Sequence, residues 1–473
     1  MLSLKNKIKK SKYNYVIHSC QDMAPYEVIA RSQQKALKVF KRAAENVELY
    51  QNYLQSKNVS GKNIDDIAAF KSSVPVIDKH SIFHSEESVN ENIFLKANQN
   101  HIQSILLSSG STGTFSFGIS TPKEIKKNNQ FIEVILDYYF NILDESSLII
   151  NCLSQSVKLP MIDTAAVVET GPRIDSLLYI LQTLASKFSQ IIIIGDNYFI
   201  KNALEAALKK NIPLGKLKIH IIVGGAYLPE KLRTHLTNIL EINQHNRHNG
   251  SIFSSMGISE FGLNLFFESP ETVRLRQLTL QNPSLKEHLL YDRYPYIPMF
   301  FNYFPQAFFL EEKNQDIIIT SLTSALRLPL IRYNTKDKGH IIPYSELNKI
   351  LKDFDRNHLL PPFKSPLVIM YGKDDYLLFN GKRIYPQQIS EGLFTDFEVA
   401  ISTTGNFRLS QKRDKPLIEI QLKKNIKLTW EFKIKIAHAL LRYIEMDIPI
   451  KIFHYQDFPY GMELDYERKF KYI

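Results

Sequence analysis

Seven small residues between positions 108 and 114 form the segment of this chain best suited to hold a phosphate group. The segment reads Ser108-Ser109-Gly110-Ser111-Thr112-Gly113-Thr114 and follows an apolar run at 105–107. Glycines let the backbone approach an anion closely, and hydroxyl and amide groups donate hydrogen bonds to it. The two glycines are too close together for the G-x-x-x-x-G-K-[ST] pattern and no lysine follows, which disfavours a P-loop NTPase. Such runs are also ordinary turns, so the segment gains weight only from other motifs.

Three later segments carry groups that suit a nucleotide. Gly224-Gly225-Ala226 follows an apolar run and forms a glycine turn that can lie flat against a planar base. Ser255-Met256-Gly257-Ile258-Ser259-Glu260 ends the next run with a carboxylate of the kind that holds Mg²⁺ near phosphates. The segment 329–337 ends at Asp337, which can accept hydrogen bonds from ribose hydroxyls. A charged joint, Gly372-Lys373-Asp374-Asp375, then precedes the last hundred residues.

In this order, the segments resemble the motifs of the adenylate-forming (acyl-activating) enzymes, specifically the phenylacetate–coenzyme A ligase-like branch. That family's motifs read roughly S-G-T-T-G-x-P, G-G-E, Y-G-x-[ST]-E, P-x-x-R-Y-x-T-x-D and G-R-x-D-D. The segments 36–54, 64–67 and 74–79 also resemble the N-terminal part of that branch. The resemblance therefore extends over nearly the whole chain.

The resemblance implies a role for each matched residue. Ser109 to Thr114 would hold the phosphates of ATP, and Gly224, Gly225 and Ala226 would flank the adenine. Glu260 would bind the metal, Asp337 the ribose, and Arg332 would steady the segment before Asp337. Asp374 would be the hinge of a mobile C-terminal domain.

The chain departs from the family pattern at four places. Met256 stands in place of the aromatic residue before Gly257, and Ala226 in place of the acidic residue of G-G-E. The hinge arginine falls on Gly372, which leaves Lys373 as the nearest cation. The family's catalytic lysine follows a C-terminal glycine, and alignment on Gly461 puts Met462 or Glu463 there. Lys469 and Lys471 are the alternatives, and we expect Lys469 to serve.

The elements that must position these residues are predicted from apolar patterns. Residues 27–54 have apolar positions at helical spacing. Short Ile/Val/Leu runs then alternate with helical stretches, at 104–107, 148–153, 191–194, 219–223, 251–253 and 317–320. Such continuous runs indicate parallel strands buried on both faces, with ligands at their carboxyl ends.

A change in the pattern of apolar runs near residue 370 predicts a domain boundary. We expect an α/β fold with a large N-terminal domain (1–371) of mainly parallel sheets covered by helices. A small, mobile α+β C-terminal domain (372–473) would follow. Strands are expected near 367–370, 376–379, 418–422 and 450–455, with a helix over 429–444.

The amino-acid composition limits the cellular compartment and the classes of binding partner that we expect. Two cysteines, Cys20 and Cys152, exclude a disulfide framework and a cysteine-built zinc site, so we expect a reducing, cytoplasmic setting. No run approaches the ~18–20 apolar residues of a membrane span, and none at the N-terminus has signal-peptide character. The net charge is +11, but the lysines are scattered, which disfavours a nucleic-acid partner. The charge can still steer an acidic partner such as a nucleotide, coenzyme A or an acidic carrier protein.

The leading hypothesis is an AMP-forming acid–thiol ligase. It would use ATP and Mg²⁺ to turn a small carboxylic acid into an acyl-adenylate, and then pass the acyl group to a thiol. The thiol would belong to coenzyme A or to the phosphopantetheine arm of an acyl carrier protein. The alternatives are acyl transfer to an amine or a protein, and a degenerate nucleotide-binding module. The acid, the acceptor and a homodimeric state are left open.

Two further groups of residues carry weaker alternatives. His245 and His248 sit three apart in a polar loop, where a metal site is less favoured than a solvated turn. Four phenylalanines near Glu260 are candidates either for an acid pocket or for the core. They are Phe253, Phe261, Phe266 and Phe267.

Overall fold

The computed structural model describes residues 4–83, 102–107, 116–154, 157–159, 162–242, 250–291, 294–322, 330–412, 415–460 and 471–473. The structural statements below concern these residues. The Ser/Gly-rich segment 108–114, the histidines at 245 and 248, and Lys469 lie outside them.

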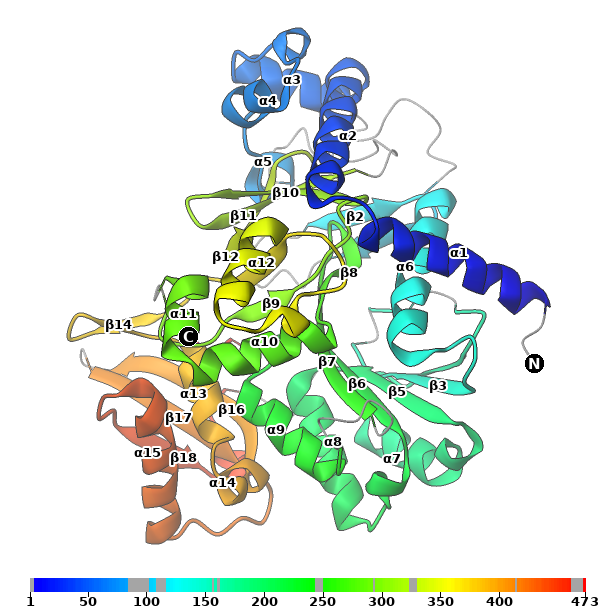
Figure 1. Ribbon diagram of the computed structural model, residues 1–473. Coiled ribbons are helices and arrows are strands. Elements are labelled where there is room, and N and C mark those ends of the chain that lie inside the picture. The colour runs from blue at the N-terminus through cyan, green and yellow to red at the C-terminus, as the bar shows by residue number, and fades with distance from the viewer. Residues whose placement is uncertain are drawn as a thin grey trace.

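A helical N-terminal part lies at the top of the molecule and along its right side in Figure 1. Its helices are α1 (Leu4–Gln21), α2 (Pro25–Asn46), α3 (Glu48–Ser56), α4 (Ile67–Ser73) and α5 (Lys79–Phe83). The single helix expected over 27–54 is two helices, because Val47 between α2 and α3 has extended backbone angles. Phe40 and Phe70 are fully buried and share a core cluster with Phe309, so α2 and α4 pack against the body of the protein.

A six-stranded sheet forms the centre of the chain. Its strands are β3 (Ser147–Asn151), β4 (Ala166–Glu169), β5 (Gln190–Gly195), β6 (Ile219–Gly224), β7 (Gly250–Ile258) and β8 (Gly262–Phe267). The order is β4-β3-β5-β6-β7-β8, and every pair is parallel except β7 with β8. The parallel sheet predicted from the apolar runs is therefore present.

Helices cover both faces of this sheet, which is why its strands are continuously apolar. Successive strand residues point to opposite faces. Thus Ile191 and Ile193 of β5 share a core cluster with α7 (Ile174–Thr183), α8 (Asn197–Lys209) and α9 (Glu230–Ile239). Ile192 and Ile194 instead share a cluster with α6 (Pro122–Phe140).

A second, five-stranded sheet is entirely antiparallel, in the order β10-β11-β12-β13-β9. Its strands are β9 (Met299–Phe301), β10 (Phe308–Lys313), β11 (Asp316–Ser321), β12 (Tyr333–Ile342) and β13 (Leu367–Gly372). Two expectations from the sequence differ from the structure of this sheet. The run at 317–320 lies in this sheet and not in the parallel one, and the strand near 367–370 pairs with β12 and β9 instead of starting the C-terminal part. An apolar run does not reveal its pairing partner, which is chosen by distant segments.

Two groups of elements complete the large part of the chain. Strands β1 (Ser104–Leu107) and β2 (Phe117–Ser120) form an antiparallel pair. Helices α10 (Pro270–Gln281), α11 (Pro283–Leu290) and α12 (Tyr344–Asp353) surround the antiparallel sheet. No helix among the described residues is long and apolar enough to cross a membrane.

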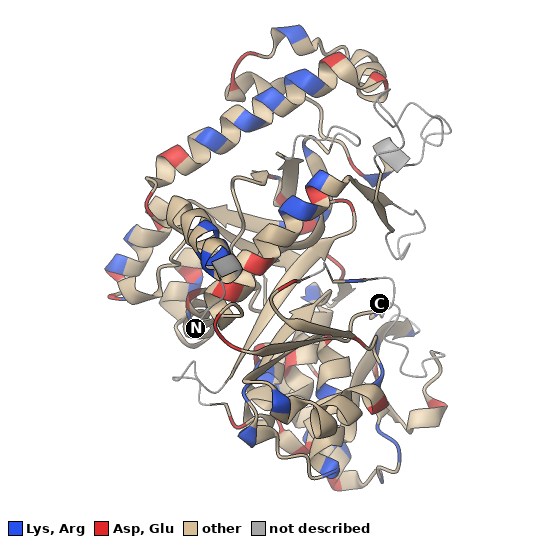
Figure 2. Ribbon diagram, turned by 90° about the vertical axis from the view of Figure 1, so that its right-hand side faces the viewer, with Lys and Arg blue, Asp and Glu red and all other residues tan. Residues whose placement is uncertain are grey.

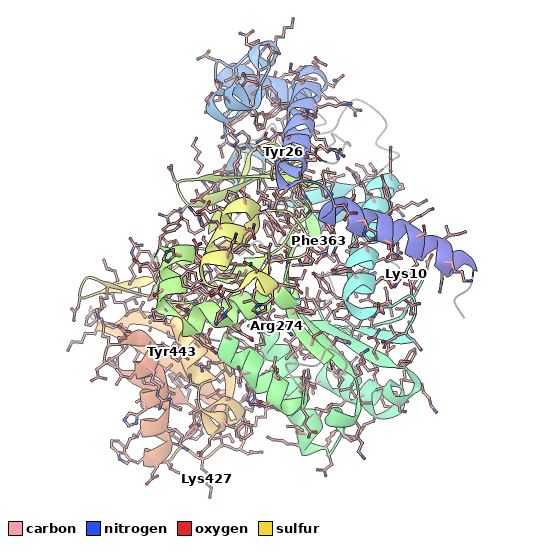
Figure 3. All side chains as sticks on the ribbon, in the orientation of Figure 1. Lys10, Tyr26, Arg274, Phe363, Lys427 and Tyr443 are labelled. Atoms are coloured by element: carbon pink, nitrogen blue, oxygen red, sulfur yellow. The ribbon has the colours of Figure 1, made fainter. Side chains whose placement is uncertain are left out.

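The C-terminal part is a small α+β unit, where Lys427 and Tyr443 are labelled in Figure 3. It holds β14 (Leu377–Phe379), β15 (Lys382–Ile384), α13 (Pro386–Leu393), α14 (Phe397–Ser402), β16 (Thr403–Lys412), β17 (Lys415–Leu422), α15 (Trp430–Ile444) and β18 (Ile450–Phe453). Strands β16, β17 and β18 form its sheet, with β17 and β18 parallel. The strands expected over 418–422 and 450–455 and the helix over 429–444 are confirmed.

Buried polar contacts join the C-terminal part to α8 and α9. The fully buried Lys201 of α8 donates to the carbonyl oxygen of Thr403, with a distance of 2.7 Å, and forms an ion pair with Glu205. Glu391 of α13 accepts hydrogen bonds from the backbone N–H groups of Glu230 and Lys231 at the start of α9, at 2.9 and 3.0 Å. The two parts are therefore in specific contact in this structure.

Charged residues are interspersed over the molecule. In the view of Figure 2, Lys and Arg occur along the N-terminal helices and again in the lower half, with Asp and Glu among them. The high net charge of +11 is thus spread over that view instead of marking one basic face.

Candidate active site

A cavity of about 880 Å³ lies where β3, β5, β6 and β7 end. Residues close to these ends line it, including Cys152, Ile194, Gly224 and Ile258. Ligands of parallel sheets bind at this edge, because the loops that follow the strands converge there. Most of the sequence-predicted site residues within the described ranges line this same cavity. They are Gly224, Gly225, Met256, Gly257, Ser259, Glu260, Asp337, Lys373 and Asp374.

Glu260 is held in place by two hydroxyl groups. Ser259 Oγ donates to Glu260 Oε2 at 3.0 Å, and Tyr333 Oη donates to Glu260 Oε1 at 2.6 Å. Burial and the adjacent carboxylate of Glu260 raise the pKa of Tyr333 well above its usual value, so the phenol stays protonated and remains a donor. The carboxylate is therefore oriented within the cavity before any ligand binds.

The strands that flank the Ser/Gly-rich segment lie beside Glu260. Leu107 ends β1 and pairs with Phe117 at the start of β2. The next residue, Gly118, approaches the carbonyl oxygens of Ser259 and Glu260 so closely that a Cβ would clash with them. This close approach is a reason for glycine at position 118, and it places the start of β2 against the backbone of Ser259 and Glu260.

Asp337 lies in a tight turn within β12. Lys336 has a positive φ of 62°, and its backbone N–H donates to Asn334 Oδ1 at 2.7 Å. The backbone N–H of Asp337 donates to Thr335 Oγ1 at 3.1 Å. These local hydrogen bonds stabilise a conformation that brings Asp337 to the cavity wall.

Arg332 lies outside the cavity lining and braces the start of β12. Its buried guanidinium forms a two-point contact with Glu311, at 3.1 and 3.0 Å, and donates to the carbonyl oxygens of Phe70 and Val74. It therefore ties β12 to β10 and to α4. Ala226 is also absent from the lining residues.

Lys373 and Asp374 follow β13 and face the same cavity. The preceding Gly372 has a φ of 85°, where glycine is favoured and a Cβ is strained. Tyr385 Oη donates to Asp374 Oδ1 at 3.2 Å. The glycine at the position of the family's hinge arginine is thus explained by backbone conformation.

Lys79 is a cavity residue that the sequence analysis did not single out. Ile77 pairs with β12: its N–H donates to the carbonyl oxygen of Arg332 at 3.1 Å, and its own carbonyl accepts from Asn334 N at 2.7 Å. This pairing places Lys79, at the start of α5, in the cavity wall. Burial lowers the pKa of Lys79, nearby Glu260 counteracts that effect, and Lys373 adds to it.

Only a local signal for Lys79 exists in the sequence. Asp78 precedes it and caps α5, accepting a hydrogen bond from Ser81 N at 3.0 Å. An Asp-Lys pair after an apolar run predicts a helix start, and it does not show which strand lies beside that helix.

The four phenylalanines near Glu260 belong to the core. Phe253, Phe261, Phe266 and Phe267 are at most 9% exposed, and none lines the cavity. Among the described residues, no three His, Cys, Asp or Glu side chains are grouped to hold a metal ion by themselves.

The chain is similar to solved structures of 2-hydroxyisobutyryl-CoA ligase. For the postadenylation state in complex with R3-HIB-AMP, the TM-score is 0.66 at 11% identity, covering 94% of this chain and 88% of that chain. For the thioesterification state with 2-HIB-AMP and CoA, the TM-score is 0.56 at 12% identity, covering 93% and 88%. For an open conformation with 2-HIB-AMP and CoA it is 0.54 at 11% identity, covering 94% and 90%.

This likeness establishes the fold. The chain has the architecture of the adenylate-forming ligases over nearly its whole length, as the sequence motifs predicted. No family model matches the chain, and no curated protein matches it.

Proposed function

We propose that this protein activates a carboxylic acid with ATP as an acyl-adenylate and then transfers the acyl group to a thiol. The observation that carries the proposal is the convergence of Glu260, Asp337, Lys373 and the glycine turn at 224–225 on one cavity. These residues come from four separate segments of the chain, and each has a chemistry that suits a different part of ATP. The fold shared with 2-hydroxyisobutyryl-CoA ligase supports the same reaction class.

Each group has a defined task in this proposal. Gly225, with a φ of 84° and open space where a Cβ would be, lets the adenine lie against the backbone. Met256 packs on the base, because a thioether adapts to a planar surface. Asp337 accepts hydrogen bonds from the ribose hydroxyls. Lys79 and Lys373 neutralise charge that develops as pyrophosphate leaves.

Glu260 fits a magnesium ion bound mainly through the nucleotide. Mg²⁺ is held in such sites by one or two carboxylates together with phosphate oxygens and water. A bound Mg²⁺ would supply charge neutralisation at the phosphates. Ser259 and Tyr333 would then keep the Glu260 carboxylate facing the ion.

The acyl acceptor in the proposal is coenzyme A or the phosphopantetheine arm of a carrier protein. The C-terminal part from residue 372 would move about Asp374 between activation and transfer. The solved 2-hydroxyisobutyryl-CoA ligase supports this, because its structures are described in postadenylation, open and thioesterification states. Acyl transfer to an amine or a protein side chain is the competing outcome.

Pyrophosphate release tests the proposal. Purified protein is incubated with ATP, Mg²⁺ and aliphatic, aryl, hydroxy, amino and dicarboxylic acids, with hydroxylamine to trap the adenylate as hydroxamate. We expect acid-dependent release, and consumption of the thiol when coenzyme A replaces hydroxylamine. ATP binding without release for any acid would contradict adenylation and indicate a nucleotide-binding module.

The Asp337→Asn variant is expected to weaken ATP binding in this assay. An amide accepts ribose hydrogen bonds less strongly than a carboxylate, and loss of a charge-assisted bond costs about 1.5–3 kcal/mol. The KM for ATP should therefore rise by about tenfold or more, with a smaller change in the KM for the acid. The control is Asp353→Asn, which removes an exposed carboxylate at the end of α12, outside the cavity lining. Equal effects on the two KM values would argue against a ribose contact.

The Glu260→Gln variant is expected to raise the Mg²⁺ concentration needed for half-maximal release. The amide keeps a similar shape but removes the negative charge that attracts the ion. Tyr333→Phe leaves that charge and removes one orienting hydrogen bond, so its effect should be smaller and in the same direction. A magnesium titration of both variants measures this. An unchanged requirement in Glu260→Gln would exclude the carboxylate as a ligand.

A further inference from the structure

One part of the cavity lining is aliphatic, and we call this part the aliphatic lobe. Helix α6 contributes to it, as do the segment after β3 and the end of β5. Its lining includes Ile132, Ile135, Leu136, Leu153, Ile162 and Ile194. Leu136, Ile162 and Ile194 also belong to one core cluster, so the floor of this lobe is continuous with the interior of the protein.

Apart from Asp196, which follows β5, the charged groups of the cavity lie elsewhere, on the elements assigned to the nucleotide. Asp78 and Lys79 come from the start of α5, and Glu260 follows β7. Asp337 belongs to β12, and Lys373 follows β13. Among the described lining residues of α6 and of the segment after β3, none carries a charge. The cavity is therefore polar on one side and apolar on the other.

The remaining polar groups near the strand ends already have partners. Asp196 Oδ1 accepts from the backbone N–H groups of Tyr198 and Phe199, at 2.9 and 3.3 Å, and so caps α8. A carboxylate at a helix N-terminus is stabilised there without a ligand cation. Ser255 Oγ and Asn264 Oδ1 lie 2.9 Å apart in a hydrogen bond. These contacts occupy Asp196 Oδ1, Ser255 Oγ and Asn264 Oδ1 within the protein.

Cys152, which also lines the cavity, is not a nucleophile. Burial raises the pKa of its thiol to about 12, and Thr170 Oγ1 donates to its sulfur at 3.3 Å. A neutral, buried thiol behaves as a small apolar group. It thus adds to the apolar wall.

We propose that this lobe holds the acyl chain and that the acid is a medium-chain aliphatic monocarboxylic acid. This inference rests on the proposed adenylation and deepens it by naming the substrate class. The carboxylate of the acid would point to the charged side, where the nucleotide binds. The chain would extend between α6 and the ends of β3 and β5. Amino acids and dicarboxylic acids are disfavoured, because their second charge would be desolvated in an apolar lobe.

Binding of non-hydrolysable acyl-sulfamoyl-adenosines tests the inference without requiring catalysis. Calorimetry compares the acetyl, butyryl, hexanoyl, octanoyl and decanoyl compounds with phenylacetyl, glycyl and succinyl compounds. Each buried methylene contributes ~0.8 kcal/mol, so affinity should rise about fourfold per methylene until the lobe is full. The glycyl and succinyl compounds should bind more weakly than the butyryl compound.

Variants of Ile132 connect the chain length to this lobe. Ile132 is half-buried on α6 and lines the cavity. Ile132→Phe should shorten the preferred chain, and Ile132→Ala should lengthen it, while the affinity of the acetyl compound stays the same. Retained binding of the acetyl compound also shows that each variant is folded. The matched control is Ile125→Phe, two turns earlier on α6 and outside the lining, which should leave the preferred chain unchanged.

The outcomes separate this inference from the proposed function. If no acyl-sulfamoyl-adenosine binds, adenylation itself is contradicted. If the compounds bind with no dependence on chain length, or if the phenylacetyl, glycyl or succinyl compound binds best, the aliphatic assignment is wrong and adenylation stands. If the Ile132 variants do not move the preferred length, the chain binds outside this lobe.

Discussion

We expect the replacement of Lys79 by glutamine to lower acid-dependent pyrophosphate release by about a hundredfold or more. Lys79 lies in the cavity wall close enough to Glu260 and Lys373 for their charges to affect its pKa. In the proposed reaction, its ammonium would neutralise negative charge that develops on the departing pyrophosphate. Removing one such preorganised group in a water-poor site typically costs ~10²–10³ in rate.

The kinetic signature distinguishes a role at the transition state from simple substrate binding. If Lys79 acts as the charge develops, kcat falls much more than the KM for ATP rises. Steady-state pyrophosphate release at saturating ATP and acid measures this. Lys62→Gln is the control, because Lys62 is an exposed lysine in η1 (Gly61–Asn63), outside the lining residues.

The variant Lys469→Gln is measured in the same assay. It compares Lys469, the catalytic lysine predicted from the sequence, with Lys79, the lysine that the structure places in the cavity wall. If Lys79→Gln retains full activity and Lys469→Gln loses it, the C-terminal lysine carries the step. If both lose activity, the two cations act together. Unchanged activity in Lys79→Gln would remove that residue from the proposed mechanism.

Replacing Glu205 by glutamine destabilises the protein by ~3–5 kcal/mol, the cost typical of breaking a buried ion pair. Its carboxylate lies on α8 and contacts three basic side chains. Lys201 Nζ is 3.1 Å from Oε2, His235 Nε2 is 2.7 Å from Oε1, and Lys423 of the C-terminal part contacts Oε2. Lys201 is fully buried, so removing the carboxylate leaves its charge without a counter-ion.

Urea unfolding at neutral pH measures the decrease in the free energy of unfolding caused by Glu205→Gln. The control is Glu398→Gln, whose ion pair with Lys435 is exposed and should contribute no more than about 1 kcal/mol. The double variant Lys201→Met, Glu205→Gln should recover part of the stability, because it removes a buried cation as well. A loss in Glu205→Gln no larger than in the control would show that the cluster adds no net stability.

The difference in stability between the wild-type protein and Glu205→Gln depends on pH, because folding shifts the pKa of Glu205. Burial would raise the pKa of Glu205, but Lys201, His235 and Lys423 outweigh it and lower the pKa from 4.5 to about 2. A carboxylate with a depressed pKa stabilises the folded state above its unfolded pKa, and loses that contribution as pH falls through the folded pKa. The wild-type protein should therefore lose more stability than Glu205→Gln between pH 4.5 and 2.

Lys201 changes the stability in the same direction, but at higher pH. Burial lowers its pKa from 10.5 to about 7. The unfolded state then binds more protons between these values, so this group makes the protein more stable as pH rises from 7 toward 10.5. Lys201 contacts the C-terminal part through the carbonyl oxygen of Thr403. The titration of Lys201 therefore also affects the hydrogen bond between α8 and the C-terminal part.

The sequence alone determined the parallel sheet, the C-terminal helix and most of the candidate nucleotide residues. Periodic apolar runs and glycine turns are local features, and burial on both faces of a sheet makes the runs continuous. The sequence also predicted that Gly224 and Glu260 lie at the same edge of the sheet, since parallel strands bring their carboxyl ends together.

Only the tertiary structure decided which distant segments complete the cavity. Lys79 reaches Glu260 because Ile77 pairs with β12, a contact between segments more than 250 residues apart along the chain. The aliphatic lobe depends on α6 lying over the ends of β3 and β5, which no local pattern shows. Likewise, Arg332 is a brace and the phenylalanines near Glu260 are core, because burial is set by neighbours that are distant in sequence.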